Sequence, residues 1–132
     1  MIVLDASAAV DLVLRRPERG PWVAERVFVG GLLHSTHLID LEVASALRRF
    51  VRTGALSPDR ARNGLDVFLL LAIRRHAPRL LVDRVWALRD TLTAYDASYI
   101  ALAEALGIPV VTTDNRLARA TGHHATVVGF PD

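Results

Sequence analysis

The chain contains neither cysteine nor lysine, and each absence excludes a class of chemistry. Without cysteine there is no disulfide framework and no thiolate metal site. Without lysine there is no lysine Schiff base and no Walker-type phosphate-binding loop, which depends on a lysine side chain. All 16 basic residues are therefore arginine. The lack of cysteine suits the reducing cytoplasm, where we expect the protein to be located.

Long apolar runs are missing as well. No window approaches the roughly 18 unbroken apolar residues that a membrane span needs, and no basic region precedes the apolar residues at the N-terminus. We therefore expect a soluble, unprocessed protein. The 132 residues, of which 52% are hydrophobic and 23% charged, match one ordinary globular domain over residues 1–132.

Short apolar segments alternate with stretches of helical spacing. Buried strands are predicted at residues 2–4 and 108–112, and a last, short strand at 126–129. Weaker signals indicate a very short strand or an extended link at 32–33 and a short edge strand or a loop at 74–78. Helices are predicted at residues 6–15, 21–29, 37–53, 57–73, 79–89, 94–106 and 115–120. Ser57 followed by Pro58 is the clearest helix start, since serine caps and proline suits the first turn.

This alternation predicts parallel strands that are joined by helical crossovers. The expected fold class is therefore α/β, a three-layer α/β/α sandwich with a short, mostly parallel central sheet. In such sheets the functional crevice lies beyond the carboxyl ends of the strands. Asp5 and Asp114 each follow a predicted strand, so we expect both at this crevice.

Asp5, Asp96 and Asp114 each have an ordinary structural explanation. Asp5 and Asp114 lie between a strand and a helix, where an aspartate accepts a hydrogen bond from a backbone N–H of the first helical turn. Asp96 lies near the start of a helix, where a negative charge complements the helix dipole. Taken one at a time, these acids are explained by capping as well as by catalysis.

Glu42 has no such explanation. Nearly all its neighbours on the predicted helix are apolar, which predicts that this helix is largely buried. Arg49 and Arg52 lie too far along the helix to pair with Glu42 at i+3 or i+4. A buried glutamate must be paired, protonated or bound to a cation. Asp40 points to another side of the helix and is expected at the surface.

The acids are more informative together than singly. Carboxylates gathered in one crevice repel each other and raise each other's pKa unless a cation neutralises them. A site built from oxygen ligands suits Mg²⁺ or Mn²⁺, with one or two carboxylates bound directly and water or substrate phosphate in the other positions. If gathered in one crevice, Asp5, Glu42, Asp96 and Asp114 would form such a metal site.

The segments around these acids resemble a known family. They read Leu-Asp-Ala-Ser at 4–7, Leu-Glu-Val at 41–43 with Ala-Leu-Arg-Arg at 46–49, Tyr-Asp-Ala-Ser-Tyr-Ile-Ala-Leu-Ala at 95–103, and Val-Val-Thr-Thr-Asp-Asn-Arg-Leu at 110–117. In order and spacing they resemble PIN-domain ribonucleases and, more narrowly, the VapC toxins of VapBC toxin–antitoxin pairs. Each motif alone is short, but the four motifs in register are specific.

The resemblance implies an endoribonuclease that depends on Mg²⁺ or Mn²⁺ and hydrolyses RNA. In this family the acids at the four positions coordinate the metal, and we expect Asp5 and Asp96 to be the chief ligands. Glu42 and Asp114 keep two possible roles, general base or ligand of a second ion.

Other residues are assigned by the same resemblance. Ser7 and Thr112 match the hydroxyl residues that support the site by hydrogen bonding. Some relatives carry a further acid shortly after the fourth, whereas Asn115 and Arg116 supply none here. The resemblance also implies a homodimer and a VapB-like antitoxin, whose C-terminal segment occupies the acidic crevice.

Two other features are compatible with these partners. Several arginines near the acids suit phosphate contact, although each also suits a solvated helix face: Arg15, Arg16, Arg48, Arg49, Arg52, Arg116 and Arg119. The apolar run at 67–73 is broader than one helical stripe. Packing in the core is the simpler explanation for this run, and contact with a partner chain is the alternative.

Competing functions fit the residues less well. Ser7 has no suitably placed His–Asp pair for a catalytic triad, and the five histidines lack the i, i+4 spacing with a third ligand that zinc sites favour. An aspartyl-phosphate mechanism needs a second aspartate soon after the first, or a lysine. The main alternative is a PIN-like interaction module that has lost catalysis, and the presence of all four acids argues against it.

Overall fold

A computed structural model describes residues 1–131, and Asp132, the last residue of the expected domain, lies outside the described residues. The strands are β1 (Ile2–Leu4), β2 (Leu33–Thr36), β3 (Ile73–His76), β4 (Val110–Thr112) and β5 (Val127–Gly129). The helices are α1 (Ala6–Val13), α2 (Arg19–Gly30), α3 (Ile39–Arg52), α4 (Pro58–Leu70), α5 (Val82–Ala87), α6 (Ala94–Leu106) and α7 (Asn115–Ala118), with a 3-10 helix η1 (Pro78–Leu81) before α5.

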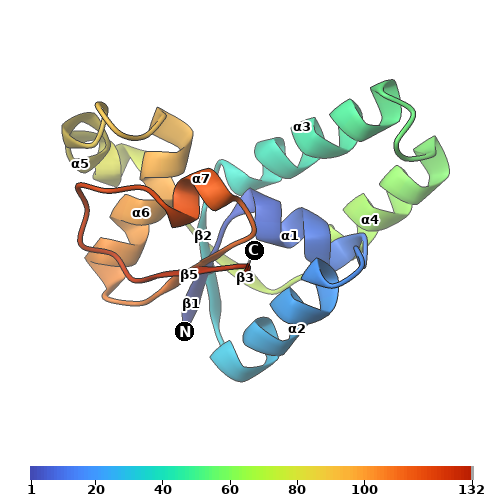
Figure 1. Ribbon diagram of the computed structural model, residues 1–132, viewed down its shortest axis with the longest axis horizontal. Helices are drawn as coiled ribbons and strands as arrows, with labels where there is room; N and C mark the ends of the chain where they lie inside the picture. Colours follow the sequence, from blue (N-terminus) through green and yellow to red (C-terminus); the bar gives the residue numbers. More distant parts are fainter. Residues whose placement is uncertain (132) are drawn as a thin grey trace.

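The strands form one five-stranded sheet in the order β3-β2-β1-β4-β5, in which every neighbouring pair is parallel. Side chains of β1 alternate between two cores. Ile2 and Leu4 pack with residues of α1 to α4, whereas Val3 packs with residues of α6 and α7. Helices therefore cover both faces of the sheet, and the predicted three-layer α/β/α sandwich is confirmed (Figure 1).

The strand order changes direction at β1. The chain runs from β1 outward to β2 and β3, then returns to the other side of β1 to form β4 and β5. A crevice opens where the direction reverses, at the carboxyl ends of β1 and β4. Leu4 is in register with Val111, and the Asp5 N–H donates to the Val111 carbonyl at 3.3 Å. This pairing brings Asp5 next to Thr112.

Helices α3 and α4 pack against each other and form a hairpin that extends away from the sheet (Figure 1). The turn between them uses Gly54, whose φ of 79° favours glycine. The start of α4 is as predicted: the Ser57 hydroxyl accepts from the Arg60 N–H at 3.2 Å, and Pro58 occupies the first turn. Helix α3 of this hairpin forms one wall of the crevice.

The prediction that α3 is buried on nearly every side is wrong. Ile39, Val43 and Leu47 are buried at four-residue intervals, but Leu41 is 73% exposed. Because α3 projects from the sheet, only one stripe of the helix has something to pack against. The apolar run at 67–73 is divided: Phe68 is fully buried in the core, whereas Leu70 is 85% exposed.

Most predicted elements match within a few residues. The weak strand signal at 74–78 corresponds to β3, an edge strand. The single helix predicted at 79–89 is instead divided into η1 and the short α5, because the chain turns tightly after Pro78. Within residues 1–131, no helix combines the length and apolar character that crossing a membrane requires.

Candidate active site

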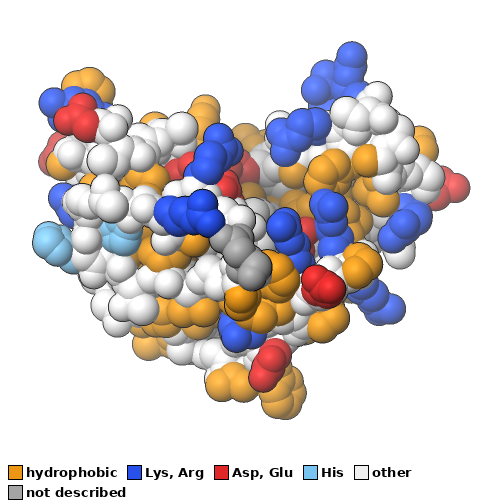
Figure 2. Space-filling model, in the orientation of Figure 1, with side chains coloured by type: hydrophobic (Ala, Val, Ile, Leu, Met, Phe, Trp, Pro, Cys, Tyr) orange, Lys and Arg blue, Asp and Glu red, His pale blue; other side chains and the backbone are white. Residues whose placement is uncertain are grey.

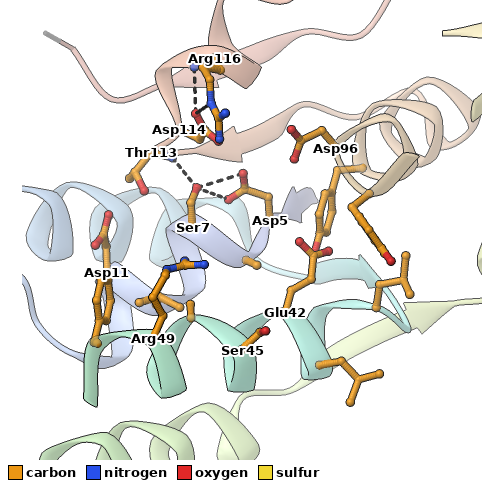
Figure 3. A pocket seen from close by; sticks show the side chains of 18 of the residues that line it. Asp5, Ser7, Asp11, Glu42, Ser45, Arg49, Asp96, Thr113, Asp114 and Arg116 are labelled. Atoms are coloured by element: carbon orange, nitrogen blue, oxygen red, sulfur yellow. Dashed lines mark hydrogen bonds and ion pairs between the residues drawn. The ribbon is translucent and has the colours of Figure 1, made fainter. Parts of the chain in front are cut away.

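One pocket of about 670 Å³ lies at the carboxyl end of the sheet. All four predicted acids line it: Asp5 after β1, Glu42 on α3, Asp96 on α6 and Asp114 after β4. Figure 3 shows their carboxylates approaching a common space from different elements. Figure 2 shows a hollow with acidic side chains at its base and blue side chains, all of them arginine, around it.

Asp5 is held by three donors. The Ser7 hydroxyl donates to Oδ1 at 2.8 Å, the Thr112 hydroxyl donates to Oδ2, and the Ala8 N–H donates to Oδ1 at 2.9 Å. The Ser7 oxygen accepts in turn from the Thr113 N–H at 3.1 Å, which orients the hydroxyl. Asp5 therefore caps α1 and presents a fixed carboxylate to the pocket. Ser7 and Thr112 both contact it, as the resemblance implied.

Burial raises the pKa of Asp5 from 3.8 to about 7, and the residue is only 4% exposed. The hydrogen bonds from Thr112, Ala8 and Ser7 oppose this rise, and the charge of Asp96 adds to it. The ionised carboxylate is thus poorly stabilised by the protein alone. A cation in the pocket would favour its charged form.

Glu42 is paired across the pocket with a tyrosine. The Tyr99 hydroxyl on α6 donates to Glu42 Oε1 at 2.8 Å, and Tyr99 is only 1% exposed. Burial, and then the charge of Glu42, raise the pKa of Tyr99, so its hydroxyl stays a donor. The pKa of Glu42 is also raised, chiefly by burial. The hydrogen bond from Tyr99 opposes this rise, and the charge of Asp96 adds to it. Of the three alternatives expected for Glu42, which were pairing, protonation or a bound cation, the structure shows a partner, the neutral Tyr99 hydroxyl.

Asp96 is the electrostatic centre of the four acids. Burial raises its pKa first, and the charge of Asp114 raises it further. The charge of Asp96 in turn raises the pKa of Asp5 and of Glu42. Thr93 caps α6 by accepting from the Asp96 N–H at 3.2 Å, and the Asp96 carboxylate faces the pocket (Figure 3).

Asp114 combines a structural contact with a place in the pocket. Its Oδ1 accepts from the Arg116 N–H at 2.9 Å and so caps the short helix α7. The Arg116 side chain is 90% exposed and its Nε lies 3.7 Å from the same oxygen, which makes this a weak surface ion pair. The capping explanation and the pocket location therefore both hold for Asp114.

The donor set suits a hard divalent cation that keeps much of its water. Among residues 1–131, no three His, Asp or Glu side chains are gathered closely enough to form a complete metal-ligand set. The acids nevertheless raise each other's pKa, which reflects repulsion that a cation would relieve. Mg²⁺ commonly takes only one or two carboxylates in proteins, with water in its other positions.

Two contacts at the site were not anticipated from the sequence. Tyr99 follows Asp96 by three residues, so both lie on one face of α6. This spacing could have predicted that Tyr99 faces the same pocket as Asp96. Asp40 is not the free surface residue that was expected. Arg75 on β3 donates to both of its oxygens, at 2.7 and 2.8 Å, and ties the first turn of α3 to the edge of the sheet.

Histidines take no part in the pocket lining. His34 and His76 do meet, with Nδ1 of the first 2.9 Å from Nε2 of the second. Their pairing joins β2 to β3 at the edge of the sheet. Burial lowers the pKa of His34, so this ring is held neutral away from the acids.

The sequence is similar to a known protein family and to several ribonucleases. The PIN domain matches residues 2–122. Ribonuclease VapC12 of Mycobacterium tuberculosis H37Rv is 42% identical over 127 residues, covering 96% of this chain and 97% of that protein. Ribonuclease VapC9 of the same strain is 42% identical over 118 residues, covering 89% of each chain. Ribonuclease VapC1 is 41% identical, covering 91% of this chain and 90% of its own.

Solved structures agree with the fold. The crystal structure of PAE2754 from Pyrobaculum aerophilum superposes with a TM-score of 0.70 at 26% identity, covering 96% of this chain and 82% of that one. VapC20 of Mycobacterium tuberculosis, a toxin that cleaves the sarcin–ricin loop, superposes with a TM-score of 0.65 at 15% identity, covering 89% and 93%. On these matches, the chain belongs to the PIN domain family and, within it, to the VapC ribonucleases.

Proposed function

We propose that this chain is the toxin of a toxin–antitoxin pair, an endoribonuclease that uses Mg²⁺ or Mn²⁺ to hydrolyse phosphodiester bonds of RNA. It would act in the cytoplasm as a single PIN-like nuclease domain. The observation that carries the proposal is the placement of four acids in one pocket at the switch point of the sheet. The 42% identity to VapC ribonucleases over nearly the whole chain supports RNA as the substrate.

Asp5 and Asp96 are the residues that would hold the metal ion, with Glu42 and Asp114 beside them. When bound, the ion would supply a polarised water and neutralise charge on the phosphate. Ser7 and Thr112 would keep the Asp5 carboxylate in one orientation, because both hydroxyls donate to it. Such fixed orientation is what makes a charged site effective, since no reorganisation is needed during the reaction.

Glu42 is our choice for the general base. Tyr99 occupies Oε1, while no hydrogen bond from residues 1–131 occupies Oε2, which can therefore accept a proton from the attacking water. Burial raises the pKa of Glu42 toward the range that suits a base. The water oxygen would bond to phosphorus as the bond from phosphorus to the leaving nucleotide oxygen breaks, and that leaving oxygen would take up a proton from solvent. Asp114 is the alternative base, or a ligand of a second ion.

The proposed partners follow from the same relatives. A VapB-like antitoxin would inhibit the toxin by occupying the acidic pocket. A homodimer is also proposed, because large apolar side chains on α4 are exposed: Leu69 at 58% and Leu70 at 85%. Light scattering on the purified chain would test the dimer, with Leu70→Glu expected to yield a monomer.

Cleavage of RNA tests the function directly. Purified chain, freed of any antitoxin, should cut an RNA pool in the presence of Mg²⁺ or Mn²⁺ and stop when EDTA is added. Asp96→Asn should abolish cutting while the protein stays folded by circular dichroism. If metal-loaded wild-type protein cuts no RNA, the chain is better described as a PIN-like interaction module without catalysis.

A further inference from the structure

The pocket continues beyond the four acids to a second, basic end. Arg16, Arg19 and Arg49 line this part, together with Asp11 and Phe50. We call the three arginines the arginine end. It lies past the C-terminus of α1 and along the later turns of α3, whereas Asp5 and Glu42 lie at the starts of these two helices.

Arg49 projects from the same helix as Glu42. Seven residues separate the two, which is about two turns of α3, so they share a face and lie roughly 10.5 Å apart along its axis. Both line the pocket, and Figure 3 shows the Arg49 side chain extending from α3 into it. One helix therefore presents an acid to the first part of the pocket and a guanidinium to the second.

The arginines differ in what holds them. Arg16 lies 3.5 Å from Asp11 and stacks on Phe50, with 5.2 Å to the ring centroid. Arg19 stacks on Phe130 at 5.4 Å. Arg49 is exposed, and no hydrogen bond or ion pair with another of residues 1–131 holds its guanidinium. Two arginines are thus fixed in place, and the third is available to an anion.

We propose that Arg49, supported by Arg16 and Arg19, binds a phosphate of single-stranded RNA next to the phosphate that is cut. The inference rests on the proposed function, which places the scissile phosphate at the acids. Every nucleotide carries a phosphate, so a strand that leaves the acids between α1 and α3 must bring one to the arginine end. A guanidinium matches a phosphate with two parallel hydrogen bonds.

Arg48 provides a matched control. It neighbours Arg49 on α3 and is exposed, but it does not line the pocket. Arg49→Ala and Arg48→Ala remove the same charge from the same helix. Both side chains are exposed, so both variants should fold as the parent does, which thermal unfolding would verify.

Binding should be measured by fluorescence anisotropy with a short, labelled, single-stranded RNA of mixed sequence. An Asp96→Asn background prevents cutting during the titration. Arg49→Ala should raise the Kd about tenfold at low salt, as expected for one lost charge-assisted contact. The slope of log affinity against log salt should become shallower by about 0.7, the value for one phosphate on a single strand. Arg48→Ala should change the Kd less than about twofold.

The kinetic readout should agree. In otherwise wild-type protein, Arg49→Ala should raise KM with little change in kcat, because this phosphate is bound equally before and during the reaction. Equal effects of Arg49→Ala and Arg48→Ala would overturn the proposal, since they would show that only the total positive charge near the pocket affects RNA binding. Unchanged RNA binding with weaker binding of an antitoxin would also overturn it, and would assign Arg49 to an acidic protein segment. These comparisons are separate from whether the wild-type protein cuts RNA, which tests the proposed function.

Discussion

Burial and charge oppose each other at Asp5. The carboxylate is almost fully buried, yet three hydrogen-bond donors are directed at it. Burial has the larger effect and raises the pKa of Asp5 to about 7. A cation bound in the pocket, as we propose, would stabilise the ionised carboxylate that the protein alone stabilises poorly.

Asp5→Asn should therefore stabilise the metal-free protein at alkaline pH while it abolishes activity. The folded-state pKa of about 7 lies above the unfolded value of 3.8, so the stability that comes from protonating Asp5 is complete below pH 3.8 and is lost as pH rises through 7. At pH 8 the variant should be more stable by roughly 1 to 4 kcal/mol. Chemical denaturation in EDTA at several pH values measures this difference.

The stability of the Asn variant must be compared with that of wild type at each pH, because His34 affects stability with the opposite pH dependence. Its pKa is lowered, so its contribution is lost as pH falls. Subtracting the Asn variant isolates Asp5. A stability difference that stays constant from pH 4 to pH 8 would contradict the burial of a titrating carboxylate at this position.

Tyr99 is expected to act through Glu42. Tyr99→Phe removes the hydroxyl that orients Glu42 and should weaken Mn²⁺ binding about tenfold, as expected for a lost hydrogen bond to a charged group. If the effect passes through Glu42, Tyr99→Phe should add nothing in a Glu42→Gln background. Calorimetry on the four proteins of this cycle measures the coupling. Tyr95→Phe, on the same helix and in the same pocket, is the control, and an equal effect there would refute a specific role for Tyr99.

Single residues differ in how well the sequence predicts them. Asp5 and Asp114 follow apolar segments, and strand ends in a parallel sheet are brought together by the topology itself. The partner of Glu42 was not predicted, because 57 residues separate it from Tyr99. Helices α3 and α6 belong to different hydrophobic cores, and the two side chains meet only at the pocket. Local patterns do not specify which helices meet.

At the scale of elements, α3 is the least predictable part. Its composition suggested a buried helix, but only the stripe of Ile39, Val43 and Leu47 is buried in the core. Exposed residues of α3, among them Leu41 and Arg49, line the pocket. A long-range pair ties the start of α3 to the sheet: Arg75 on β3 donates to Asp40 in the first turn, two residues before Glu42. The alternation of strands and helices, by contrast, was readable because each element carries its own periodicity.

Asp40→Ala should destabilise the protein by about 1 kcal/mol and also weaken Mn²⁺ binding. The pair is bidentate but partly exposed, with side chains 27% and 37% accessible, so solvent screening keeps its energy modest. The control is Asp66→Ala, which breaks a more exposed i, i+4 pair with Arg62 at the same distance of 2.7 Å. Denaturant unfolding should show little change for the control. Equal loss in both variants would mean that Asp40 does not position α3.

At the scale of the whole molecule, a parallel sheet with its switch point at β1 places residues from four distant segments at one crevice. The three-layer architecture could be predicted because buried strands alternate with amphipathic helices. The arginine end of the pocket could not be predicted, because its position depends on how far α1 and α3 run side by side. Acidic and basic ends in one pocket suit a polyanionic strand that is cut at one point and bound at another.

In the proposed site, Asp5 and Asp96 hold one catalytic divalent cation, and Glu42 and Asp114 beside it add to the negative charge that attracts it. Calorimetric titration of Mn²⁺ into wild-type protein and its amide variants tests this arrangement, with Asp11→Asn as the control because Asp11 lines the same pocket beside Arg16 rather than among the acids. We expect wild-type protein to bind Mn²⁺, each of the four amide variants to bind it at least about tenfold more weakly, and Asp11→Asn to bind it normally. Absence of Mn²⁺ binding by wild-type protein, or equal weakening by Asp11→Asn, would contradict a metal site at these acids.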